Sequence, residues 1–594
     1  MTEIVREKPI QFSLPRRIKR LEELAYNLWW VWHPVAQRLF KEIDALLWEE
    51  TYHNPIVFLR DCERSRLNAV THDRYFLDQY DQVLREFDRY MHEKDTWFSQ
   101  TYPEMTDELM AYFSFEFGLH ESLMVYAGGL GILSGDHLKE SSDLGIPLVG
   151  VGFVYTYGYF SQRISEDGWQ QAENVPIDFD ALPLIRLIDE NGEPVKISID
   201  LPGRKVHARI YQLDVGRVRL YLLHTNIPEN DPNDRQLTDR LYISDLELRI
   251  SQEILLGMGG VRALRKLGYR PTAWHMNEGH SAFLTLERAL EYVQKGLAFD
   301  EAAEKVKVNS IFTTHTPVPA GNDEFPLWLI DKYFVHVWGD LGLSREEFIN
   351  IAKIKQSWGG DAFSMPILAL KLSQFRNGVS EMHGRVAQGM WSFLWPDKKE
   401  EEVPIDHITN GIHTETWLAR RLDMTIVFGP TADAQWGNAI LTRLPVQSRG
   451  TAPLPVDDLL LRRGLVYVTI PWGDNQAATI IATHYHNPAD GGAIRVQQSE
   501  ALLDLWAEKP LTLVMGDFNA DPWDAEIQLL IDNGLSDTWA TVATDFGYTN
   551  PLPGPQRRID YIFASKDLQG RNATVPVVDG SDHLPVTAVF ARQP

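Results

Sequence analysis

The chain opens with the periodicity of a helix. Apolar residues recur there at spacings of three and four: Ile18, Leu21, Leu24, Ala25 and Leu28. This spacing places them on one face of a helix. Charged stretches such as FDRYMHEKD continue the helical character to about Lys94. We therefore predict a helical N-terminal region over residues 1–105.

Strands and helices alternate in the next part of the chain. AYFSFE at 111–116 is a short apolar strand, and residues 176–240 alternate apolar and polar positions, which predicts further strands. A helix is expected from Arg249 to Leu267. Strand-to-loop junctions follow at 272–280, 311–319 and 377–383. The alternation predicts an α/β unit with a mostly parallel sheet over residues 106–421.

The pattern changes again near Asp423. GNAILTRLPV, LVYVTIPW and AATIIATHYHN read as strands, VQQSEALLDLWAEK as a helix, and LTLVMGDFNADPWDAE as a strand that leads into an acidic loop. Between the two patterns, residues 405–438 contain a single Gly429-Pro430 step and no extended turn-rich linker. Domain boundaries usually lie in flexible linkers. We interpret this stretch as a seam, with a separate part at 422–594.

Composition narrows the class of protein. With 594 residues, 44% hydrophobic and 23% charged, the chain is long enough for several globular domains. The net charge of −25 argues against a basic nucleic-acid footprint over the whole chain. The single cysteine, Cys62, excludes an intramolecular disulfide framework and a cysteine-based zinc cluster. Because we find no secretory or membrane-spanning segment, we expect a cytoplasmic protein without a membrane partner.

A glycine loop, Gly128-Gly129-Leu130-Gly131, lies between the strand at 111–116 and a predicted helix. Glycines let a backbone approach a ligand closely, and a helix start favours an anion. By itself the loop is more often a structural turn, and it does not match the dinucleotide pattern G-x-G-x-x-G. His275, Glu278 and His280 suggest a zinc site, but their spacing is not H-E-x-x-H, so we give that reading little weight.

Several segments occur in one order that is hard to obtain by chance: ELAYNLWWVW, the glycine loop with its flanks, NEGHSAF, THTPVP, NGVSEMH, and TNGI followed by Trp417. They resemble the bacterial and archaeal type of α-glucan phosphorylase, the glycogen and maltodextrin phosphorylase family. The resemblance covers about residues 15–418. It implies the N-terminal lobe of a type-B glycosyltransferase fold.

The resemblance also implies roles for single residues. Gly128, Gly129 and Leu130 would border the phosphate and the transferred glucosyl unit, and His280 and Asn410 would contact the sugar. Trp417 would pack near pyridoxal phosphate, which the family holds through a lysine of its C-terminal lobe. The implied partners are α-glucan and phosphate, which react to glucose 1-phosphate. We find no segment that resembles the family's S-G-T-x-x-M-K lysine motif.

The last part carries four short signatures in order: Thr483-His484, Gly516-Asp517-Phe518-Asn519, Arg558-Ile559-Asp560-Tyr561 and Ser581-Asp582-His583. They resemble the endonuclease/exonuclease/phosphatase superfamily, which implies a two-sheet α/β sandwich, here a partial one.

Phosphoester cleavage needs an oriented water and a hard cation such as Mg²⁺. By resemblance, Asp517 would position the nucleophilic water beside Asn519, and His484 would face the scissile phosphate. His583, oriented by Asp560, would be the general base or a phosphate contact. Asp582 would lie near the metal.

The superfamily's opening strands, which carry an asparagine and the principal metal-binding glutamate, are not found before Gly437. We therefore expect weak metal binding and open sheet edges. Three hypotheses remain: a glucan phosphorylase-type enzyme, a Mg²⁺-dependent phosphoesterase with nucleic acid as an open substrate question, and a fusion of two partial genes that catalyses little.

Overall fold

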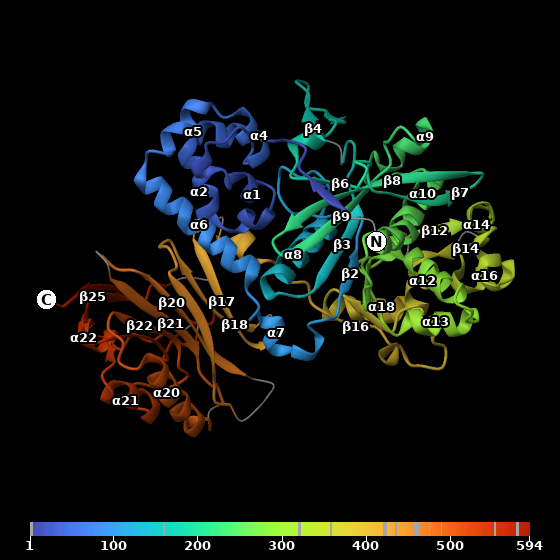
Figure 1. Ribbon diagram of the computed structural model, residues 1–594. Helices are drawn as coiled ribbons and strands as arrows, with labels where there is room; N and C mark the ends of the chain where they lie inside the picture. The colour runs from blue at the N-terminus through green and yellow to red at the C-terminus, as the bar shows by residue number, and fades with distance from the viewer. Residues whose placement is uncertain are drawn as a thin grey trace. The chain divides into compact units, whose positions relative to one another are not determined.

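The structure is a computed structural model, and it describes residues 4–158, 161–318, 322–356, 359–419, 424–433, 436–456, 462–473, 476–488, 490–543, 545–551, 554–577 and 581–593. The chain forms two compact units, Met1–Val31 with Ala36–His413, and Trp32–Val35 with Thr414–Pro594. Each unit is considered by itself (Figure 1). Among the described helices, none has the length and apolar character needed to cross a bilayer.

The N-terminal region is helical, as the periodicity predicts. Its helices are α1 Leu21–Ala25, α2 Pro34–Ile43, α3 Ala45–Glu50, α4 Pro55–Asp61, α5 Arg64–Val70, α6 Arg74–His92 and α7 Trp97–Thr101. Side chains of Asp44, Asn54, Asp73 and Thr96 cap four of them, which satisfies N–H groups that have no partner within a helix. Trp29 and Trp30 are 1% exposed, so they are core residues.

An eleven-stranded sheet forms the centre of the first unit. Its strands are β1 Val5–Glu7, β2 Met110–Phe113, β3 Leu148–Phe153, β6 Ile185–Ile188, β7 Lys196–Leu201, β8 Arg204–Val215, β9 Val218–His224, β10 Ala273–Asn277, β11 Ser310–Thr313, β15 Phe375–Gly378 and β16 Asp406–His407. The run β9-β3-β2-β10-β11-β15-β16 is parallel throughout. The α/β architecture with a mostly parallel sheet is therefore confirmed.

The direction of the strand order changes at β2. Strand β3 lies on one side of β2 and strand β10 on the other. In open α/β sheets, ligands bind at the carboxyl ends of the strands where the order reverses in this way. The loop after β2 leads into α8 Gly129–Leu144, and the chain after β10 carries the NEGHSAF segment. The candidate sugar-binding residues thus converge on this point.

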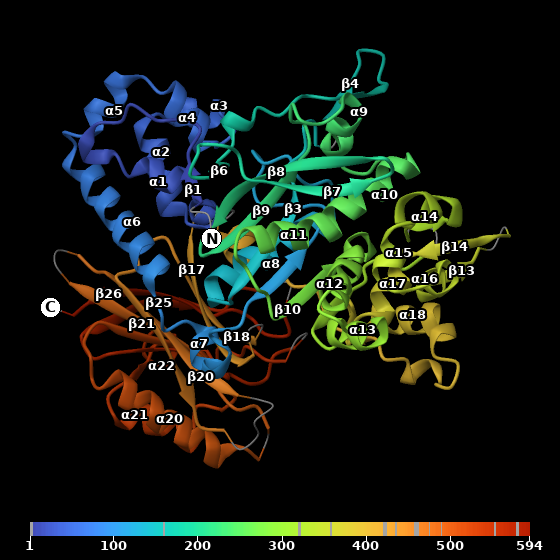
Figure 2. The same cartoon turned by 45° about the vertical axis from the view of Figure 1, so that its right-hand side comes forward.

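Further helices surround the sheet, and α12 to α18 group at one side of it (Figure 2). They are α9 Pro232–Arg235, α10 Leu246–Ile254, α11 Gly260–Lys266, α12 Phe283–Val293, α13 Phe299–Lys307, α14 Leu327–Phe334, α15 Val337–Asp340, α16 Arg345–Ala352, α17 Met365–Lys371 and α18 Glu381–Trp391. Two small sheets complete the unit, namely β12 Glu324–Pro326, β14 Asp361–Ser364 and β13 Lys353–Lys355, and the projecting hairpin β4 Ser161–Ile164 with β5 Gln170–Glu173 (Figure 1).

The helix expected from Arg249 to Leu267 differs from the prediction in one respect. A π-helical turn, Leu255–Gly259, separates α10 from α11. A Cβ on Gly257 would lie 2.6 Å from the backbone nitrogen of Leu284, and one on Gly260 would lie 2.6 Å from the Phe113 ring. Small residues in and next to the turn therefore let it approach both α12 and β2. Helical spacing alone does not reveal such a turn.

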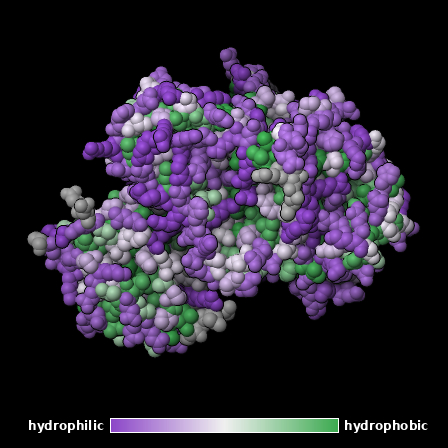
Figure 3. Space-filling view, viewed as in Figure 1, coloured by the Kyte–Doolittle hydropathy of each residue, from purple (hydrophilic) through white to green (hydrophobic). Residues whose placement is uncertain are grey.

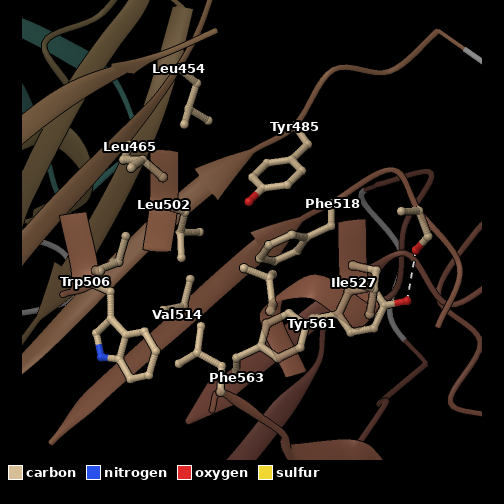
Figure 4. Close-up of a cluster of buried hydrophobic side chains, with 14 residues drawn as sticks. Leu454, Leu465, Tyr485, Leu502, Trp506, Val514, Phe518, Ile527, Tyr561 and Phe563 are labelled. Atoms are coloured by element: carbon tan, nitrogen blue, oxygen red, sulfur yellow. Dashed lines mark hydrogen bonds between the residues drawn. The ribbon is translucent and has the colours of Figure 1, made fainter. Parts of the chain in front are cut away.

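The second unit is built on a six-stranded sheet. In order across the sheet its strands are β19 Ser448–Leu454, β20 Arg463–Pro471, β21 Ala477–His484, β22 Thr512–Asp517, β24 Asp560–Ala564 and β23 Ser536–Asp537. Helices α20 Gly492–Trp506 and α21 Ala525–Asp532 cover one face, and α22 is Thr538–Val542. Their shared core includes Tyr485, Leu502, Val514 and Phe563 (Figure 4).

The opposite face carries two separate strand pairs, β17 Thr425–Asp433 with β18 Trp436–Thr442 and β25 Leu568–Thr574 with β26 Thr587–Arg592. Within the described residues no strand joins the pairs, so the second layer of the sandwich is interrupted. Strand β17 itself, from the seam, was not expected. The face drawn in Figure 3 is mostly hydrophilic, with apolar residues in smaller groups, one of them over the second unit.

The core of the second unit gives a stability prediction. Phe563 is fully buried and lies 5.2 Å, between ring centroids, from both Phe518 and Tyr561. We expect Phe563→Ala to lower the free energy of opening of β22 and β24 by about 3–5 kcal/mol, because it leaves a cavity. Amide hydrogen exchange of peptides from both strands measures this, with α12 as an internal reference.

The matched control is Val589→Ala, since Val589 is 58% exposed on β26. It should change the free energy of opening of β22 and β24, measured by the same exchange experiment, by no more than about 0.5 kcal/mol. Equal protection of β22 in the Phe563 variant and in the unmodified chain would show that this cluster does not hold the sheet together.

Candidate functional site

The glycine loop of the first unit borders open space. A Cβ on Gly128 or on Gly129 would meet no atom within 4 Å, whereas one on Gly131 would lie 2.6 Å from Glu116 Oε2. A Cβ on Gly135 would lie 2.0 Å from the carbonyl oxygen of Gly118. The two leading glycines therefore leave room beside the loop, and the two later ones are required for packing. Leu130, which the sequence groups with them, is the second residue of α8.

Glu116 holds the start of this loop. Its Oε2 accepts hydrogen bonds from the N–H groups of Ala127, at 2.7 Å, and Gly128, at 3.2 Å. The Tyr242 hydroxyl donates to the other carboxylate oxygen, and Glu116 is 1% exposed. The N–H groups of Ala127 and Gly128, which could have bound an anion, are thus already hydrogen-bonded to Glu116. The N–H groups of Gly129 and Leu130, at the first positions of α8, remain for a ligand.

His280 lies behind the loop in the short helix Gly279–Ser281. Its ring stacks on Phe115 at 4.3 Å between centroids, and its Nε2 accepts the Phe115 N–H at 3.1 Å. Burial, together with the charge of Arg249, holds the pKa of His280 well below its usual value. The ring is therefore neutral near pH 7, and since Nε2 accepts, the proton is on Nδ1.

Glu278 is a site residue to which sequence reasoning gave no role beyond the zinc reading. It adopts a φ of 76°, which is unusual for a residue other than glycine and costs of order 1–3 kcal/mol. Its carboxylate accepts from the His315 N–H at 3.2 Å and the Thr316 hydroxyl at 3.1 Å. Burial raises the pKa of Glu278 to about 7. The signal in the sequence that could have identified Glu278 as a site residue is its position within the NEGHSAF segment.

Arg249 is a second residue that the sequence did not mark. Its guanidinium lies 4.5 Å from the centre of the Phe115 ring and forms ion pairs with Asp323, at 2.7 Å, and Glu253, at 3.0 Å. Burial raises the pKa of Glu253 well above its usual value. Charges this deep are stable only when paired. The network holds Arg249 against the Phe115 ring, on which His280 stacks.

The remaining expected glucan and cofactor residues, Asn410 and Trp417, are both exposed. Asn410 is exposed, and its N–H donates to the Val379 carbonyl at 3.0 Å. Trp417 is 44% exposed in the short helix Glu415–Ala419 of the second unit. Pyridoxal phosphate needs a lysine amine, and the hydrogen bonds described above for Glu116, the start of the glycine loop and Tyr242 do not involve one.

The second unit brings its predicted residues together by strand register. His484 at the end of β21 lies opposite Asp517 at the end of β22, and Asp517 lies opposite Asp560 on β24. His484 Nε2 is 3.3 Å from Asp517 Oδ2, and His583 Nδ1 is 2.8 Å from Asp560 Oδ2. Asn519, at a φ of 50°, donates its N–H to Asp517 at 2.8 Å.

The pKa values of the titratable groups in this cluster are shifted in different directions. Burial raises the pKa of Asp517, and the neighbouring Asp560 carboxylate adds to this effect, while His484 opposes it. Burial and the charge of Arg463 lower the pKa of His484. Burial also lowers the pKa of His583, but the hydrogen bond to Asp560 and the charge of nearby carboxylates outweigh it, so that this pKa is raised. One histidine therefore stays neutral while the other gains a proton more easily.

Ligand atoms of Asp517, Asp560 and His583 all lie within 4.8 Å of one another. Two carboxylates offer the oxygen ligands that Mg²⁺ prefers, so this group fits a divalent cation. Asp582 is exposed and is not part of that group; its carbonyl accepts from the Asn550 side chain at 3.4 Å. Arg558, in the R-I-D-Y signature, pairs with buried Asp537 at 2.7 Å and has a structural contact there.

Comparison with known proteins finds different matches toward the two ends of the chain, and the second of them begins inside the first unit. Residues 14–123 match a family described as "Protein of unknown function (DUF3417)", and residues 378–583 match the Endonuclease/Exonuclease/phosphatase family. The chain is 43% identical over 409 residues to the maltodextrin phosphorylase of Thermococcus litoralis, an alignment that covers 69% of this chain and 48% of that protein.

Two further relatives are glycogen phosphorylases. That of Mycobacterium tuberculosis H37Rv is 42% identical over 434 residues, 70% of this chain and 50% of the relative. That of Aquifex aeolicus is 39% identical over 402 residues, 68% of this chain and 56% of the relative. Both expected resemblances are confirmed. The chain spans about half the length of the curated relatives it matches.

The His583–Asp560 pair gives a pKa prediction. Replacing the carboxylate by the neutral amide in Asp560→Asn removes both the ionic hydrogen bond and the charge that raise the pKa of His583. Burial then dominates, and we expect this pKa to fall below its value in the unmodified chain. An NMR pH titration of the His583 ring protons measures it.

Asp582→Asn is the matched control, because Asp582 makes the smallest of the contributions that raise the same pKa. Its effect should be clearly smaller. An unchanged His583 titration in Asp560→Asn would contradict the assigned cause.

Proposed function

We propose that the first unit is the glucan-binding half of an α-glucan phosphorylase-type glycosyltransferase, which converts α-1,4-glucan and phosphate to glucose 1-phosphate. The observation that carries this proposal is the open space beside Gly128 and Gly129, next to the neutral, buried His280. The position at the reversal of strand order supports it. So does the identity to the maltodextrin phosphorylase of Thermococcus litoralis.

The residues of the chain would act as follows. The Nδ1–H of His280 donates to a sugar hydroxyl, and the rigid stack on Phe115 keeps that donor aimed. The glycine loop lets the sugar approach the backbone, while the N–H groups of Gly129 and Leu130 face the phosphate. Asn410 gives a further sugar contact.

The proposal distinguishes glucan binding from catalysis of phosphorolysis. The relatives extend over about twice the matched length. We therefore propose that the unit binds glucan and catalyses little phosphorolysis by itself, as expected for a fusion of two partial genes. Cys62 as the single cysteine fits a reducing compartment, and the cytoplasm is part of the proposal.

A binding measurement tests this function. Calorimetry should detect maltoheptaose binding to the full chain, and His280→Ala should weaken it roughly three- to tenfold, the equivalent of one lost hydrogen bond of about 0.5–1.5 kcal/mol. His72→Ala, at an exposed position in the turn between α5 and α6, is the control and should leave the affinity unchanged. Equal affinity in both variants, or no binding at all, would sink the proposal. Phosphorolysis with added pyridoxal phosphate and phosphate should stay near background.

A second function, Mg²⁺-dependent phosphoesterase activity, is favoured by the cluster of Asp517, Asp560 and His583. Asp517 would position the attacking water and share the cation with Asp560. The raised pKa of His583 favours its protonated form, so we assign it the phosphate contact. His484 faces the same phosphate, and Asn519 orients Asp517 through its N–H. A bound Mg²⁺ would neutralise charge on the phosphoryl oxygens.

Hydrolysis of bis(p-nitrophenyl) phosphate tests this second function. We expect slow release of nitrophenolate that requires Mg²⁺ and stops with a chelator. Asp517→Asn should lower the rate at least tenfold, because an amide neither binds the cation nor orients the water as well. Asp532→Asn, at an exposed acidic position of α21, should leave it unchanged. Chelator-insensitive hydrolysis, or an unaffected Asp517 variant, would count against the phosphoesterase.

A further inference from the structure

A cavity of about 720 Å³ opens on the first unit beside β15 and β16. Its lining includes Ile311 of β11, Phe375 and Arg376 of β15, and Ile405 and Ile408 on either side of β16. Ile311 and Phe375 pair near the amino ends of their parallel strands. The glycine loop and the NEGHSAF segment, by contrast, follow the carboxyl ends of β2 and β10. The cavity is therefore separate from the candidate sugar-binding site.

Much of this lining is apolar. Ile405 is buried, whereas Phe375 is 54% exposed and Ile408 is 59% exposed. The Gln388 side chain of α18 donates to the Ile405 carbonyl at 2.9 Å, which fixes the chain next to β16. Cavities of this volume that combine an apolar lining with a few polar groups are typical of small-molecule sites. The exposed side chains offer apolar surface that a ligand could cover.

Arg376 brings a positive charge to the lining. Its Nε donates to the Leu370 carbonyl at 2.6 Å, and its Nη1 lies 3.3 Å from the Gln374 carbonyl and 3.5 Å from that of Pro404. The guanidinium lies 5.4 Å from the centre of the Trp395 ring. All of these partners are neutral. Among the described residues, no carboxylate pairs with Arg376 and no acceptor bonds to its Nη2, so two N–H groups remain.

A purely structural role explains only part of this arrangement. Leu370 lies in the last turn of α17, so the Nε contact caps the carboxyl end of that helix. A helix end offers about half an elementary charge, which is less than the full charge of a guanidinium. Burial lowers the pKa of Arg376 to about 10, and no carboxylate of the described residues offsets this effect. A half-buried cation is thus left short of negative charge beside a cavity.

Asp406 is the acidic residue of the described lining, and it does not supply the missing charge. Its side chain is 90% exposed, and its Oδ1 accepts the N–H of His407 at 2.8 Å. Water and salt screen a carboxylate in such a position. An anion that binds at Arg376 therefore meets little repulsion from it.

We propose that this cavity binds an amphiphilic organic anion, whose carboxylate or phosphate head meets the Nη2 group of Arg376 and whose apolar body covers Phe375 and Ile408. A guanidinium binds both head groups, because its planar N–H groups match the spacing of their oxygens. The inference is independent of the proposed glucan and phosphoester functions, since it uses none of their residues.

Displacement of a fluorescent probe tests the site in the full chain. The dye 8-anilinonaphthalene-1-sulfonate joins an aromatic body to an anionic head and should become brighter on binding to exposed apolar surface. Octanoate and octyl phosphate should displace it. 1-Octanol, which has the same apolar body without charge, should need at least about a tenfold higher concentration, because a hydrogen bond between charged groups is lost. Inorganic phosphate, a head without a body, should not displace the dye.

Each ligand gives a decisive result. Displacement by octanoate and octyl phosphate, or by one of them alone, supports the site and identifies the head group that it prefers. 1-Octanol that displaces the dye as well as octanoate does would overturn the role of the anionic head. Displacement by inorganic phosphate at the same concentration as octyl phosphate would overturn the role of the apolar body.

Arg376→Gln tests the source of the charge. It removes the cation, so the Kd of octanoate should rise roughly tenfold or more. Arg385→Gln is the matched control, since Arg385 is an arginine of α18 outside the described lining that pairs with Glu381, and its side chain is 75% exposed. It should leave the Kd unchanged. Equal affinity in the two variants would contradict the assignment of Arg376.

Phe375 allows a second test that leaves the contacts of Arg376 in place, should Arg376→Gln fail to fold. Because Phe375 is largely exposed, both Phe375→Asp and Phe375→Lys should fold. The two variants remove the same ring but place opposite charges beside the head group. Octanoate should bind at least about fivefold more weakly to the Asp variant than to the Lys variant. Equal binding to both would show that no anionic head lies at this wall and would overturn the proposal.

Discussion

The parallel pairing of β2, β10 and β11 is the constraint on which the first unit depends. Met276 pairs with Phe113 and Asn277 with Thr313, so the three strands end at one edge. Whatever residues follow these ends must meet there. Glu116, Glu278 and His315 meet for this reason, although about 200 residues separate the first from the last. The hydrogen bonds of Asn277 then cross all three strands, which ties the loops to the sheet and to each other.

Burial is the common physical cause behind the chemistry of both units. It keeps His280 and His315 neutral in the first unit and raises the pKa of Glu278. In the second unit burial also favours the neutral forms, since it raises the pKa of Asp517 and lowers that of His484. His583 departs from this rule because it has an ionic partner, Asp560, at 2.8 Å. The buried histidines of the first unit are therefore neutral near pH 7, whereas the ionic partner of His583 makes it easier to protonate.

Much of the fold could be predicted from the sequence, and less of the sites. Alternation of strands and helices predicts the parallel sheet, and signatures at strand ends predict His484, Asp517 and Asp560, since register brings strand ends together without further information. The spacing of apolar residues alone could not predict the π-helical turn at Leu255–Gly259, because this turn depends on the packing of Gly257 against α12. Nor could it show that Glu116 occupies the amides of Ala127 and Gly128, because that contact depends on side-chain direction.

The second layer of the sandwich in the second unit consists of two separate strand pairs, and one of them begins within the seam. Strand β17 begins at Thr425, within the seam, and pairs with β18, while β25 and β26 form their own pair. Unpaired edges beside a core lose the cross-strand contacts that stabilise a sheet. The cluster of Asp517, Asp560 and His583 avoids this problem, because both aspartates lie on the continuous six-stranded sheet and His583 bonds to Asp560. The positions of Asp517 and Asp560 therefore depend on the six-stranded sheet and not on the two separate strand pairs.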